Sequence, residues 1–388
     1  MPIDPAIEAF AADAKEWRRD IHRHPELLYD VHRTSAFVAE RLKAFGCDEV
    51  ATGLGRTGVV GVIRGRLGES SKTIGLRADM DALPIHETTN LPYQSTVEGK
   101  MHACGHDGHT AMLLGASRYL AATRNFAGSA VVIFQPAEEG GAGAKAMIDD
   151  GLMERFGVAQ VFGMHNMPQL PVGAFATRKG PLLAAADPFT IAIEGRGGHA
   201  AYPHRCIDPI IAGVQIITAL QTIVSRGVDP VDSCVLSVTC FNAGNTDNVI
   251  PQTAQLMGTV RTFLKDTRDF TERRVKEIVK NVGAAMGVAV EIDYRRNYPA
   301  TRNHPDETDF AIGVAKKVAG DDKVVADMPP VMGAEDFSFM LEARPGAFIM
   351  IGNGDSAGLH DPKYDFNDAA LPYGMSYWAR LVETALAA

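Results

Sequence analysis

The pattern of hydrophobic and polar positions predicts strands and helices in alternating order over the first half of the chain. Short apolar runs such as residues 58–63 are typical of buried strands, whereas the apolar positions of residues 34–45 recur at helical spacing. The predicted elements are helix 34–45, strands 58–63 and 73–76, helix 109–122, strand 130–134, a helix around 143–149 and strand 160–164. This alternation indicates an α/β sheet with helices on its faces.

From about Pro188 the predicted order changes. Strand 189–194, helix 209–225, strands 234–241 and 254–262, helix 270–286 and strand 289–294 follow one another. The order β-α-β-β-α-β is the ferredoxin-like pattern. Afterwards helix 307–318, a strand near 348–351 and helix 373–387 resume the α/β style.

These two patterns predict a discontinuous catalytic domain with an inserted domain. Residues 1–183 and 299–388 would form an α/β domain whose mixed sheet is flanked by helices. Residues 184–298 would form a ferredoxin-like α+β domain that interrupts it. A length of 388 residues fits two or three domains at roughly 100–200 residues each.

Composition and charge indicate which partners the protein can bind and which cellular compartment suits it. The net charge is −9, so no basic excess is available for a nucleic-acid backbone. Five cysteines without a C-x-x-C pair indicate a reducing compartment, and we expect a cytoplasmic protein. The first residues lack a signal-peptide pattern, and no stretch approaches the ~18 apolar residues of a membrane span. We therefore expect neither a nucleic-acid nor a membrane partner.

Potential metal ligands concentrate in the segment MHACGHDGH, residues 101–109. Cys104 and His106 flank Gly105 just before a predicted helix, and a thiolate and an imidazole at that spacing can bind one ion. A single His or Cys here would be better explained as a polar loop that caps a helix. Three His and one Cys together favour a metal site.

An acidic pair follows the next predicted strand. Glu138 and Glu139 lie in QPAEEGG, directly after strand 130–134, where ligands of open α/β sheets gather. Adjacent carboxylates repel, so both stay ionised more readily beside a cation. One could bind a metal while the other acts as a general base. The alternative is a solvated acidic turn.

Other candidate residues follow further strands. His165 lies at the end of strand 160–164, and His360 follows the strand near 348–351. Asp79 and Asp81 follow strand 73–76, where either could bind a metal or orient a ligating His. His199 lies in the glycine-rich EGRGGHAAYPH of the inserted domain, where a strand-to-helix turn with a surface His is the competing interpretation.

Several common catalytic and phosphate-binding motifs are missing from the sequence. GLGRTG, residues 53–58, has only the form of a dinucleotide fingerprint, because it precedes a strand instead of following one. There is no G-x-S-x-G nucleophile elbow and no H-E-x-x-H.

Together the motifs resemble the M20 metallopeptidase family over nearly the whole chain. The matching segments are WRRDIHRHPEL, LRADMDALP, MHACGHDGHTAMLLGA, QPAEEGGAGAKAMI, GMHNMP, GRGGHAAYPH, NVIPQTAQLMGTVRT and MGAEDFSF. They are most similar to the amidohydrolase branch of hippurate hydrolases, N-acyl-amino-acid amidohydrolases and indole-3-acetyl-amino-acid hydrolases.

The resemblance implies a zinc-exopeptidase-like catalytic domain that binds two divalent metal ions. The ions would be Zn²⁺ or Mn²⁺, with Ni²⁺ or Co²⁺ also compatible with the ligands. The implied metal ligands are Cys104, His106, Glu139, His165 and His360. Other branches carry a His where this chain has Asp79, so Cys104 would be the replacement ligand.

The resemblance also assigns catalytic and substrate-binding roles. Glu138 would be the general base, and Asp81 would be one of the catalytic residues. His199 would contact the substrate and stabilise the oxyanion, and Asn248 and Arg261 would contribute to substrate contacts.

The implied reaction is hydrolysis of the amide bond of an N-acyl-amino acid, such as hippurate or an N-acetyl-amino acid, by a metal-activated water. The alternatives are a dipeptidase or carboxypeptidase of the same family, and a non-catalytic binding protein on the same scaffold. The resemblance further implies a homodimer through the inserted domain, with a tetramer as a variant.

Overall fold

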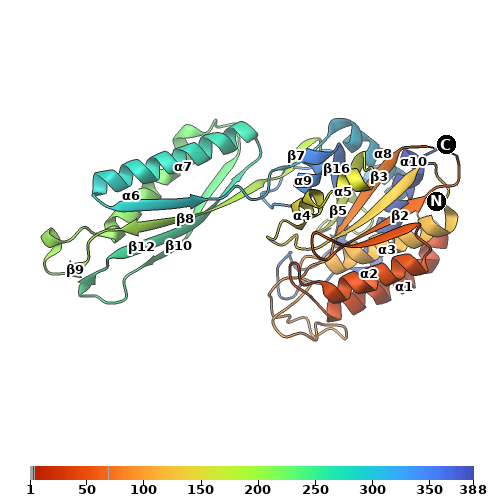
Figure 1. Ribbon diagram of the computed structural model, residues 1–388, viewed down its shortest axis with the longest axis horizontal. Helices are drawn as coiled ribbons and strands as arrows, with labels where there is room; N and C mark the ends of the chain where they lie inside the picture. Colours follow the sequence, from red (N-terminus) through yellow and green to blue (C-terminus); the bar gives the residue numbers. More distant parts are fainter. Residues whose placement is uncertain (1–2, 4, 69) are drawn as a thin grey trace. The chain divides into compact units, whose positions relative to one another are not determined.

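The computed structural model describes residues 3, 5–68 and 70–388, which form two compact units (Figure 1). Unit 1 comprises Met1–Leu182, Arg302–Pro329 and Asp336–Ala388. Unit 2 comprises Leu183–Thr301 and Pro330–Glu335. Unit 1 is therefore assembled from segments on both sides of unit 2 in the sequence.

Unit 1 contains an eight-stranded mixed sheet of order β1-β2-β4-β3-β5-β16-β6-β15. The strands are β1 (Glu49–Leu54), β2 (Gly58–Arg64), β3 (Thr73–Asp79), β4 (Ser129–Gln135), β5 (Gln160–Pro168), β6 (Phe175–Ala176), β15 (Val324–Val325) and β16 (Gly346–Gly354). The four central strands β4, β3, β5 and β16 run parallel, whereas β1 and β2 pair antiparallel at one edge. The predicted mixed sheet is confirmed.

Helices cover both faces of this sheet. One face carries α1 (Pro5–Arg23), α2 (His32–Ala44), α3 (His106–Thr123), α8 (Pro305–Ala319) and α10 (Leu371–Ala385). The other face carries the shorter α4 (Gly143–Asp149), α5 (Leu152–Arg155) and α9 (Phe337–Ala343). This is the three-layer arrangement of an α/β domain.

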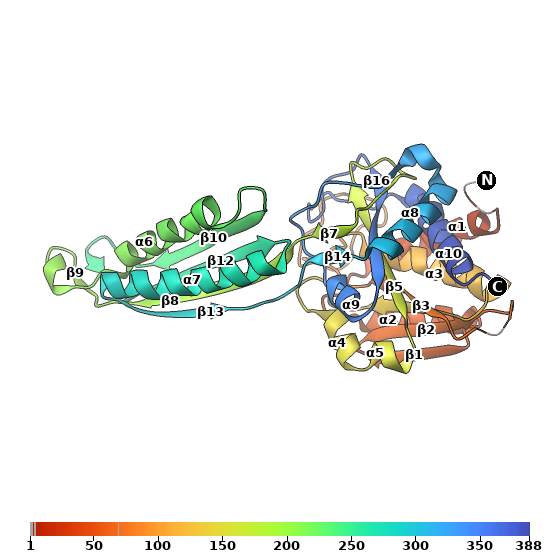
Figure 2. The ribbon, with the colours of Figure 1, turned by 90° about the horizontal axis from the view of Figure 1, so that it is seen from above.

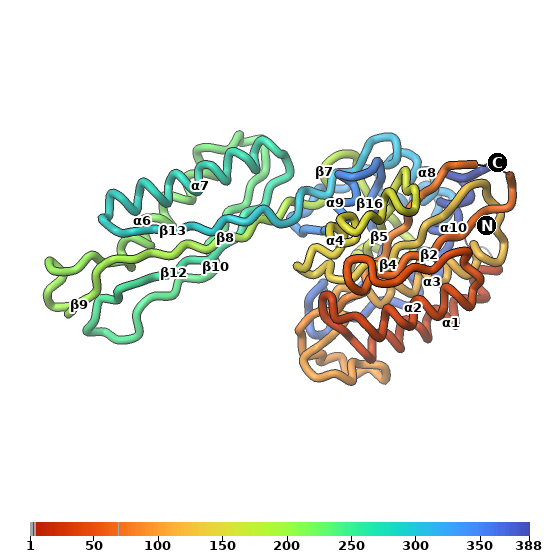
Figure 3. The backbone as a smooth tube through the Cα atoms, viewed as in Figure 1, coloured from red at the N-terminus to blue at the C-terminus, as the bar shows by residue number. Residues whose placement is uncertain are grey.

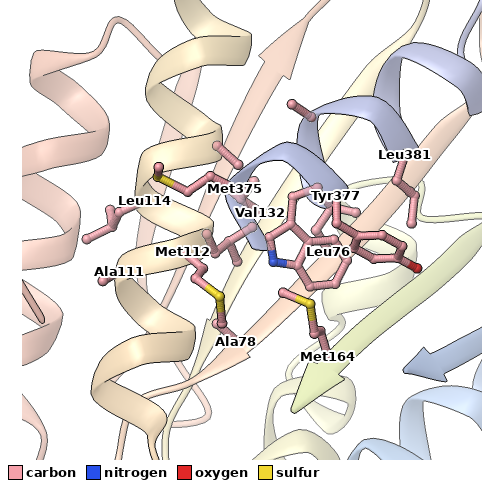
Figure 4. Close-up of a cluster of buried hydrophobic side chains, with 14 of the residues drawn as sticks. Leu76, Ala78, Ala111, Met112, Leu114, Val132, Met164, Met375, Tyr377 and Leu381 are labelled. Atoms are coloured by element: carbon pink, nitrogen blue, oxygen red, sulfur yellow. The ribbon is translucent and has the colours of Figure 1, made fainter. Parts of the chain in front are cut away.

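The core of unit 1 lies between the central strands and the pair α3 and α10. Figure 4 shows Leu76 of β3 and Val132 of β4 against Met112 of α3 and Met375 of α10. Helix α3 is apolar or small on nearly every face and is almost entirely buried. A helix that is hydrophobic all round belongs inside a large core. Packing on every side therefore fixes the position of α3, including its first residue, His106.

Several element boundaries differ from the prediction, and those of β3, α3 and β5 affect candidate residues. Strand β3 continues to Asp79 instead of ending at residue 76, because β4 pairs with it over this length, so Asp79 lies inside the strand and does not follow it. Helix α3 begins at His106 instead of residue 109, because Gly105 adopts a left-handed φ of 88° and turns the chain into the helix. Strand β5 continues to Pro168 instead of ending at residue 164, because β16 pairs with it over this length. His165 therefore lies inside a strand and not at its end, which corrects the prediction.

The connection from β3 to α3 runs through residues 80–105 without a regular helix or strand, as the tube in Figure 3 shows. Its two ends carry Asp81 and Cys104. Backbone hydrogen bonds fix it to neighbouring segments, among them Ala82 N to Glu26 O at 2.8 Å. The residues at its ends are therefore held by the body of unit 1.

Unit 2 has the predicted ferredoxin-like topology. Its antiparallel sheet has the order β10-β12-β8-β13, and α6 and α7 lie side by side along it (Figure 2). The elements are β8 (Ala185–Glu194), α6 (Pro209–Thr222), β10 (Cys234–Ala243), β12 (Thr253–Thr262), α7 (Lys265–Met286) and β13 (Ala289–Tyr294). A short pair, β9 (Gly198–His199) and β11 (Val249–Ile250), follows β8.

One helical stretch of unit 2, Pro209–Gly227, is long and apolar enough to cross a membrane by length and composition. This stretch differs from the expectation that no part of the chain approaches a membrane span, and uncharged Thr, Gln and Gly residues separate its apolar positions. Ala212, Ile216 and Leu220 of this stretch pack into the core of unit 2. The same length and composition therefore also describe a helix that covers a sheet.

Candidate metal centre

The predicted ligands of unit 1 meet at one edge of the sheet. The carboxyl ends of the parallel strands β4, β3, β5 and β16 lie at the same edge. Glu138 and Glu139 follow β4, His165 lies near the end of β5, and His360 follows β16. Cys104 and His106 reach the same place from the start of α3. A site at this edge is the usual place for a ligand in an open α/β sheet.

Their donor atoms lie within metal-binding distance of one another. Cys104 Sγ is 3.3 Å from His165 Nε2, and His360 Nε2 is 3.3 Å from Glu139 Oε1. His106 Nε2 is 3.9 Å from Glu139 Oε1 and 4.0 Å from Glu138 Oε2. Overlapping groups of three donors within 4.8 Å of each other contain all five predicted ligands.

The histidine rings are held so that Nε2 faces the centre. His106 Nδ1 donates to the carbonyl oxygen of Asp81 at 2.8 Å, and His165 Nδ1 donates to that of Asn166 at 2.7 Å. Because a carbonyl oxygen only accepts, both rings carry a proton on Nδ1, and Nε2 is the atom that faces the other donors. Such a hydrogen bond on the other nitrogen is the usual support of a metal-binding histidine.

Buried polar atoms that make no hydrogen bond show that this donor set fits a cation. His106 Nε2 and Glu139 Oε1 are buried and accept or donate no hydrogen bond within the described residues. Burial raises the pKa of the Cys104 thiol well above its usual value, and Glu139, Glu138 and Asp79 raise it further. A thiolate therefore needs a cation here, as thiolate ligands generally do when buried.

The local electrostatic field is negative. Burial disfavours a charged His106, but Asp79, Asp81 and Glu139 outweigh burial and raise the pKa of His106 to about 10. Carboxylates that favour a protonated imidazole also favour a bound cation at the same place.

Gly105 permits the tight spacing of Cys104 and His106. Besides its positive φ, a side chain at this position would collide with the amide of Asn166 and the hydroxyl of Tyr364. His360 also has a positive φ of 66°, and its N–H donates to Ala103 O at 2.8 Å. Such strained positions are concentrated at functional sites.

Asp79 and His109 satisfy each other instead of pointing to a cation. His109 Nδ1 is 2.6 Å from Asp79 Oδ1, and His109 Nε2 accepts from Asn166 N at 2.9 Å. The second Asp79 oxygen accepts from Arg77 Nη1 at 2.8 Å. His106, His109 and Arg77 outweigh the effect of burial and hold the pKa of Asp79 well below its usual value. Of the two roles considered for Asp79, orientation of neighbouring groups fits this geometry.

Asp81 holds the acidic pair in place. Its Oδ1 accepts from the backbone N–H of Glu138 at 2.9 Å, and its Oδ2 accepts from that of Glu139 at 3.2 Å. Its carbonyl oxygen also orients His106. Asp81 therefore holds three of the predicted site residues, His106, Glu138 and Glu139, through its contacts.

Arg77 is a buried residue that the sequence analysis did not single out. It lies within β3 and pairs with Asp79. It also pairs at 3.1 Å with Asp336, the residue directly before α9. The side-chain amide of Gln135 donates to the same Asp336 carboxylate. All three charged side chains are at most 1% exposed. An arginine in an otherwise apolar strand is the signal that could have indicated a buried partner.

Replacing Arg77 with methionine is expected to destabilise the protein by about 3–5 kcal/mol, because it leaves buried carboxylates uncompensated. Chemical denaturation of the variant and of Arg66→Met, an exposed control, measures the difference. A loss for Arg77→Met no larger than that of the control would contradict the structural role assigned to Arg77.

A second buried network supports the start of α3. Arg18 Nε lies 2.8 Å from Asp107 Oδ2, and His22 Nδ1 lies 2.8 Å from the same oxygen. His22 Nε2 lies 3.3 Å from Glu87 Oε1. Asp107 follows His106 directly, so this network fixes the first turn of the helix. Arg18 and His22 belong to the motif WRRDIHRHPEL, and this network gives them a structural role.

The remaining predicted residues lie in unit 2. His199 is exposed, accepts from Ala201 N at 3.1 Å and pairs with Val249 across β9 and β11. Asn248 is next to it, since its carbonyl accepts from Ala200 N at 3.0 Å.

Arg261 lies far from these two residues within unit 2. It is opposite Ala186 on β8, whereas β9 follows the other end of that strand at Glu194. At ~3.3 Å per residue, eight strand positions correspond to roughly 25 Å. Burial lowers the pKa of Arg261, although Asp187 opposes the shift. Unit 2 thus brings His199 and Asn248 together but not Arg261.

Comparison with known proteins gives one family. The family profile described as peptidase family M20/M25/M40 matches residues 75–384. The chain is 45% identical over 381 residues to hippurate hydrolase of Campylobacter jejuni, covering 98% of both chains. It is 42% identical over 358 residues to thermostable carboxypeptidase 2 of Saccharolobus solfataricus, covering 89% of both.

A solved structure agrees with this fold. The crystal structure of the Bacillus subtilis YXEP protein, described as a dinuclear metal binding peptidase from the M20 family, matches with a TM-score of 0.84. Its sequence is 35% identical, and the match covers 98% of this chain and 99% of that one.

Proposed function

Since this chain belongs to peptidase family M20/M25/M40, we propose that it is a metal-dependent amidohydrolase that cleaves the amide bond of N-acyl-amino acids. The observation that carries the proposal is that the five predicted metal ligands lie together, and that the buried His106 Nε2 and Glu139 Oε1 make no hydrogen bond among the described residues. The similarity to a hippurate hydrolase supports the choice of substrate class.

Cys104, His106, Glu139, His165 and His360 would hold two divalent cations. Their mixture of soft and hard donors is compatible with Zn²⁺ or Mn²⁺, and with Co²⁺ or Ni²⁺. When bound, such ions lower the pKa of a water molecule and polarise the carbonyl group of the substrate.

Glu138 would act as the general base. Its side chain is 8% exposed, and its backbone N–H donates to Asp81. Oε2 lies 4.0 Å from His106 Nε2, so the carboxylate borders the donor set without being needed as one of the five ligands. It would accept a proton from the attacking water and deliver it to the leaving amine.

His199 would stabilise the oxyanion that forms on the substrate carbonyl. Its exposed ring carries no hydrogen bond on Nε2 within the described residues, and its Nδ1 accepts from Ala201 N, so Nε2 is the protonated donor atom. His199→Ala is expected to lower kcat by about 10²–10³-fold with a smaller change in KM. Steady-state kinetics measure both, and an effect confined to KM would make His199 a binding residue only.

A peptidase activity is the second candidate function. The identity to a carboxypeptidase, over 89% of both chains, favours it specifically. A free carboxylate next to the cleaved amide is common to both substrate classes, so the metal centre alone does not separate them.

The experiment compares amine release from hippurate, N-acetyl-amino acids, indole-3-acetyl-amino acids and dipeptides. We expect metal-dependent turnover of the acylated compounds, with kcat/KM at least tenfold above that for dipeptides of the same amino acid. A preference for dipeptides would replace the proposed substrate class by the second candidate. If the metal-loaded protein released no amine from any of these compounds, a non-catalytic binding role would be favoured.

A further inference from the structure

The turn between β1 and β2 presents an exposed arginine that the metal centre does not use. Arg56 lies in GLGRTG, the segment without a phosphate-binding context in the sequence. It has a φ of 73°, a left-handed conformation that favours glycine. A non-glycine residue in this conformation costs conformational free energy, and such strained positions are concentrated at functional sites.

The surrounding backbone holds this turn rigidly. Gly55 N donates to Asp150 Oδ2 at 2.7 Å, and Thr57 N donates to Gly55 O at 3.0 Å. Thr57 Oγ1 donates to Tyr29 O at 2.9 Å, and Ser35 Oγ donates to Thr57 O. The position of Arg56 is therefore fixed on both sides of the residue.

Stacking fixes the side chain as well. The Arg56 guanidinium carbon lies 4.1 Å from the centroid of the Tyr29 ring. A guanidinium that stacks on an aromatic face keeps its N–H groups at the edge of the plane available for a planar anion.

Tyr29 connects this arginine to the metal centre. Its hydroxyl donates to Gly141 O at 2.6 Å, in the same loop as Glu138 and Glu139. The neighbouring Leu28 accepts from Ala137 N at 3.1 Å, one residue before Glu138. Arg56 thus stands one side chain away from the loop that carries the proposed base.

The electrostatic surroundings of Tyr29 include both Arg56 and the acidic groups near the metal centre. Burial raises the pKa of Tyr29, Asp336 and Asp81 raise it further, and Arg56 opposes them. Among the described residues Arg56 forms no ion pair, and its guanidinium makes a cation–π contact with the Tyr29 ring. A preorganised cation without a carboxylate partner therefore stacks on the tyrosine that is hydrogen-bonded to the loop of Glu138 and Glu139.

We propose that Arg56, stacked on Tyr29, is a specificity-determining residue that binds a carboxylate group of the substrate. The inference rests on the proposed function and adds to it the residue that binds a carboxylate of the substrate. A planar guanidinium suits a carboxylate through two parallel hydrogen bonds. The carboxylate belongs either to the amino acid or to the acyl group, and the experiment separates these two sources.

The test uses three substrates that differ in where they carry charge. N-benzoylglycine has its carboxylate on the amino-acid side, N-succinylglycinamide has it on the acyl side, and N-benzoylglycinamide has none. Wild type, Arg56→Gln and Arg56→Lys are compared with Arg66→Gln. Arg66 is an equally charged, exposed residue beyond the opposite end of β2. A compound that is not hydrolysed is compared by its inhibition constant against N-benzoylglycine.

We expect Arg56→Gln to raise KM or the inhibition constant about 10–100-fold for one carboxylate-bearing compound, as loss of a hydrogen bond to a charged group does. The neutral compound should change less than about threefold, and Arg56→Lys should recover part of the loss. A loss confined to N-benzoylglycine places the carboxylate on the amino-acid side, and a loss confined to N-succinylglycinamide places it on the acyl side.

Equal effects on all three compounds, or no effect on any, would overturn the inference. Thermal unfolding of each variant separates these results from loss of folding, and Arg66→Gln separates them from a change in net charge. If wild type hydrolyses none of the acylated compounds, the proposed function fails instead. An active wild type with an unaltered Arg56→Gln variant counts against Arg56 alone.

Discussion

Replacing Glu138 with glutamine is expected to lower kcat by about 10²–10⁴-fold, because the amide cannot accept the proton of the attacking water. The substitution preserves size and keeps the backbone N–H that donates to Asp81. None of the five proposed ligands is removed, so the variant should still bind metal. Steady-state kinetics and metal analysis of the purified variant measure both quantities.

Two controls define what this result means. Glu40→Gln changes an exposed glutamate of α2 and should leave turnover unchanged. Glu139→Gln changes a proposed ligand and should lower the metal content together with turnover. A Glu138→Gln enzyme that is fully loaded with metal and retains kcat within about threefold of wild type would refute the role of Glu138 as general base.

Replacing Cys104 with serine is expected to weaken metal binding by more than about 100-fold. Loss of a residue that only supports a ligand typically costs about 10–100-fold, and loss of a ligand should cost more. Cys104 is buried, and its Sγ lies 3.3 Å from His165 Nε2, within the donor set. Serine keeps the volume, but its hydroxyl does not supply a thiolate. Metal content after dialysis and competition with a chelator measure the affinity.

Cys47→Ser is the matched control, because Cys47 is a half-buried cysteine of unit 1 away from the donor set. It should bind metal like wild type. If Cys104→Ser also retained its metal ions through the same chelator competition, Cys104 would be removed from the ligand set.

The candidate ligands could be predicted from the sequence because they follow recognisable strands and belong to distinctive clusters of residues. Cys104, His106, Glu138 and Glu139 each lie in short motifs with several polar groups. A run of parallel strands places such motifs at one sheet edge, and the structure has this arrangement for β4, β3, β5 and β16. The predicted β-α-β-β-α-β order likewise corresponds to the sheet of unit 2.

The supporting contacts could not be predicted, because they join residues far apart in the sequence. Arg77 and Asp336 are 259 positions apart, and His22 and Asp107 are 85 positions apart. The hydrogen bonds that the backbone N–H groups of the acidic pair donate to Asp81 depend on the irregular connection that follows β3. No periodicity marks such contacts.

Local pattern also fails where pairing extends an element. Residues 165–168 lack the apolar run of a buried strand, yet β16 continues to pair with them, so His165 lies inside β5. The roles of His199, Asn248 and Arg261, the homodimer through unit 2 and the cytoplasmic location stay predictions.

The most direct test of the central claim is a metal titration of amide hydrolysis. The protein is freed of metal by chelation, and Mn²⁺ or Zn²⁺ is added while amine release from N-benzoylglycine is followed. The account predicts no turnover by the metal-free protein and a rise in activity that saturates at two equivalents of metal per chain. Undiminished turnover by the metal-free protein would contradict it.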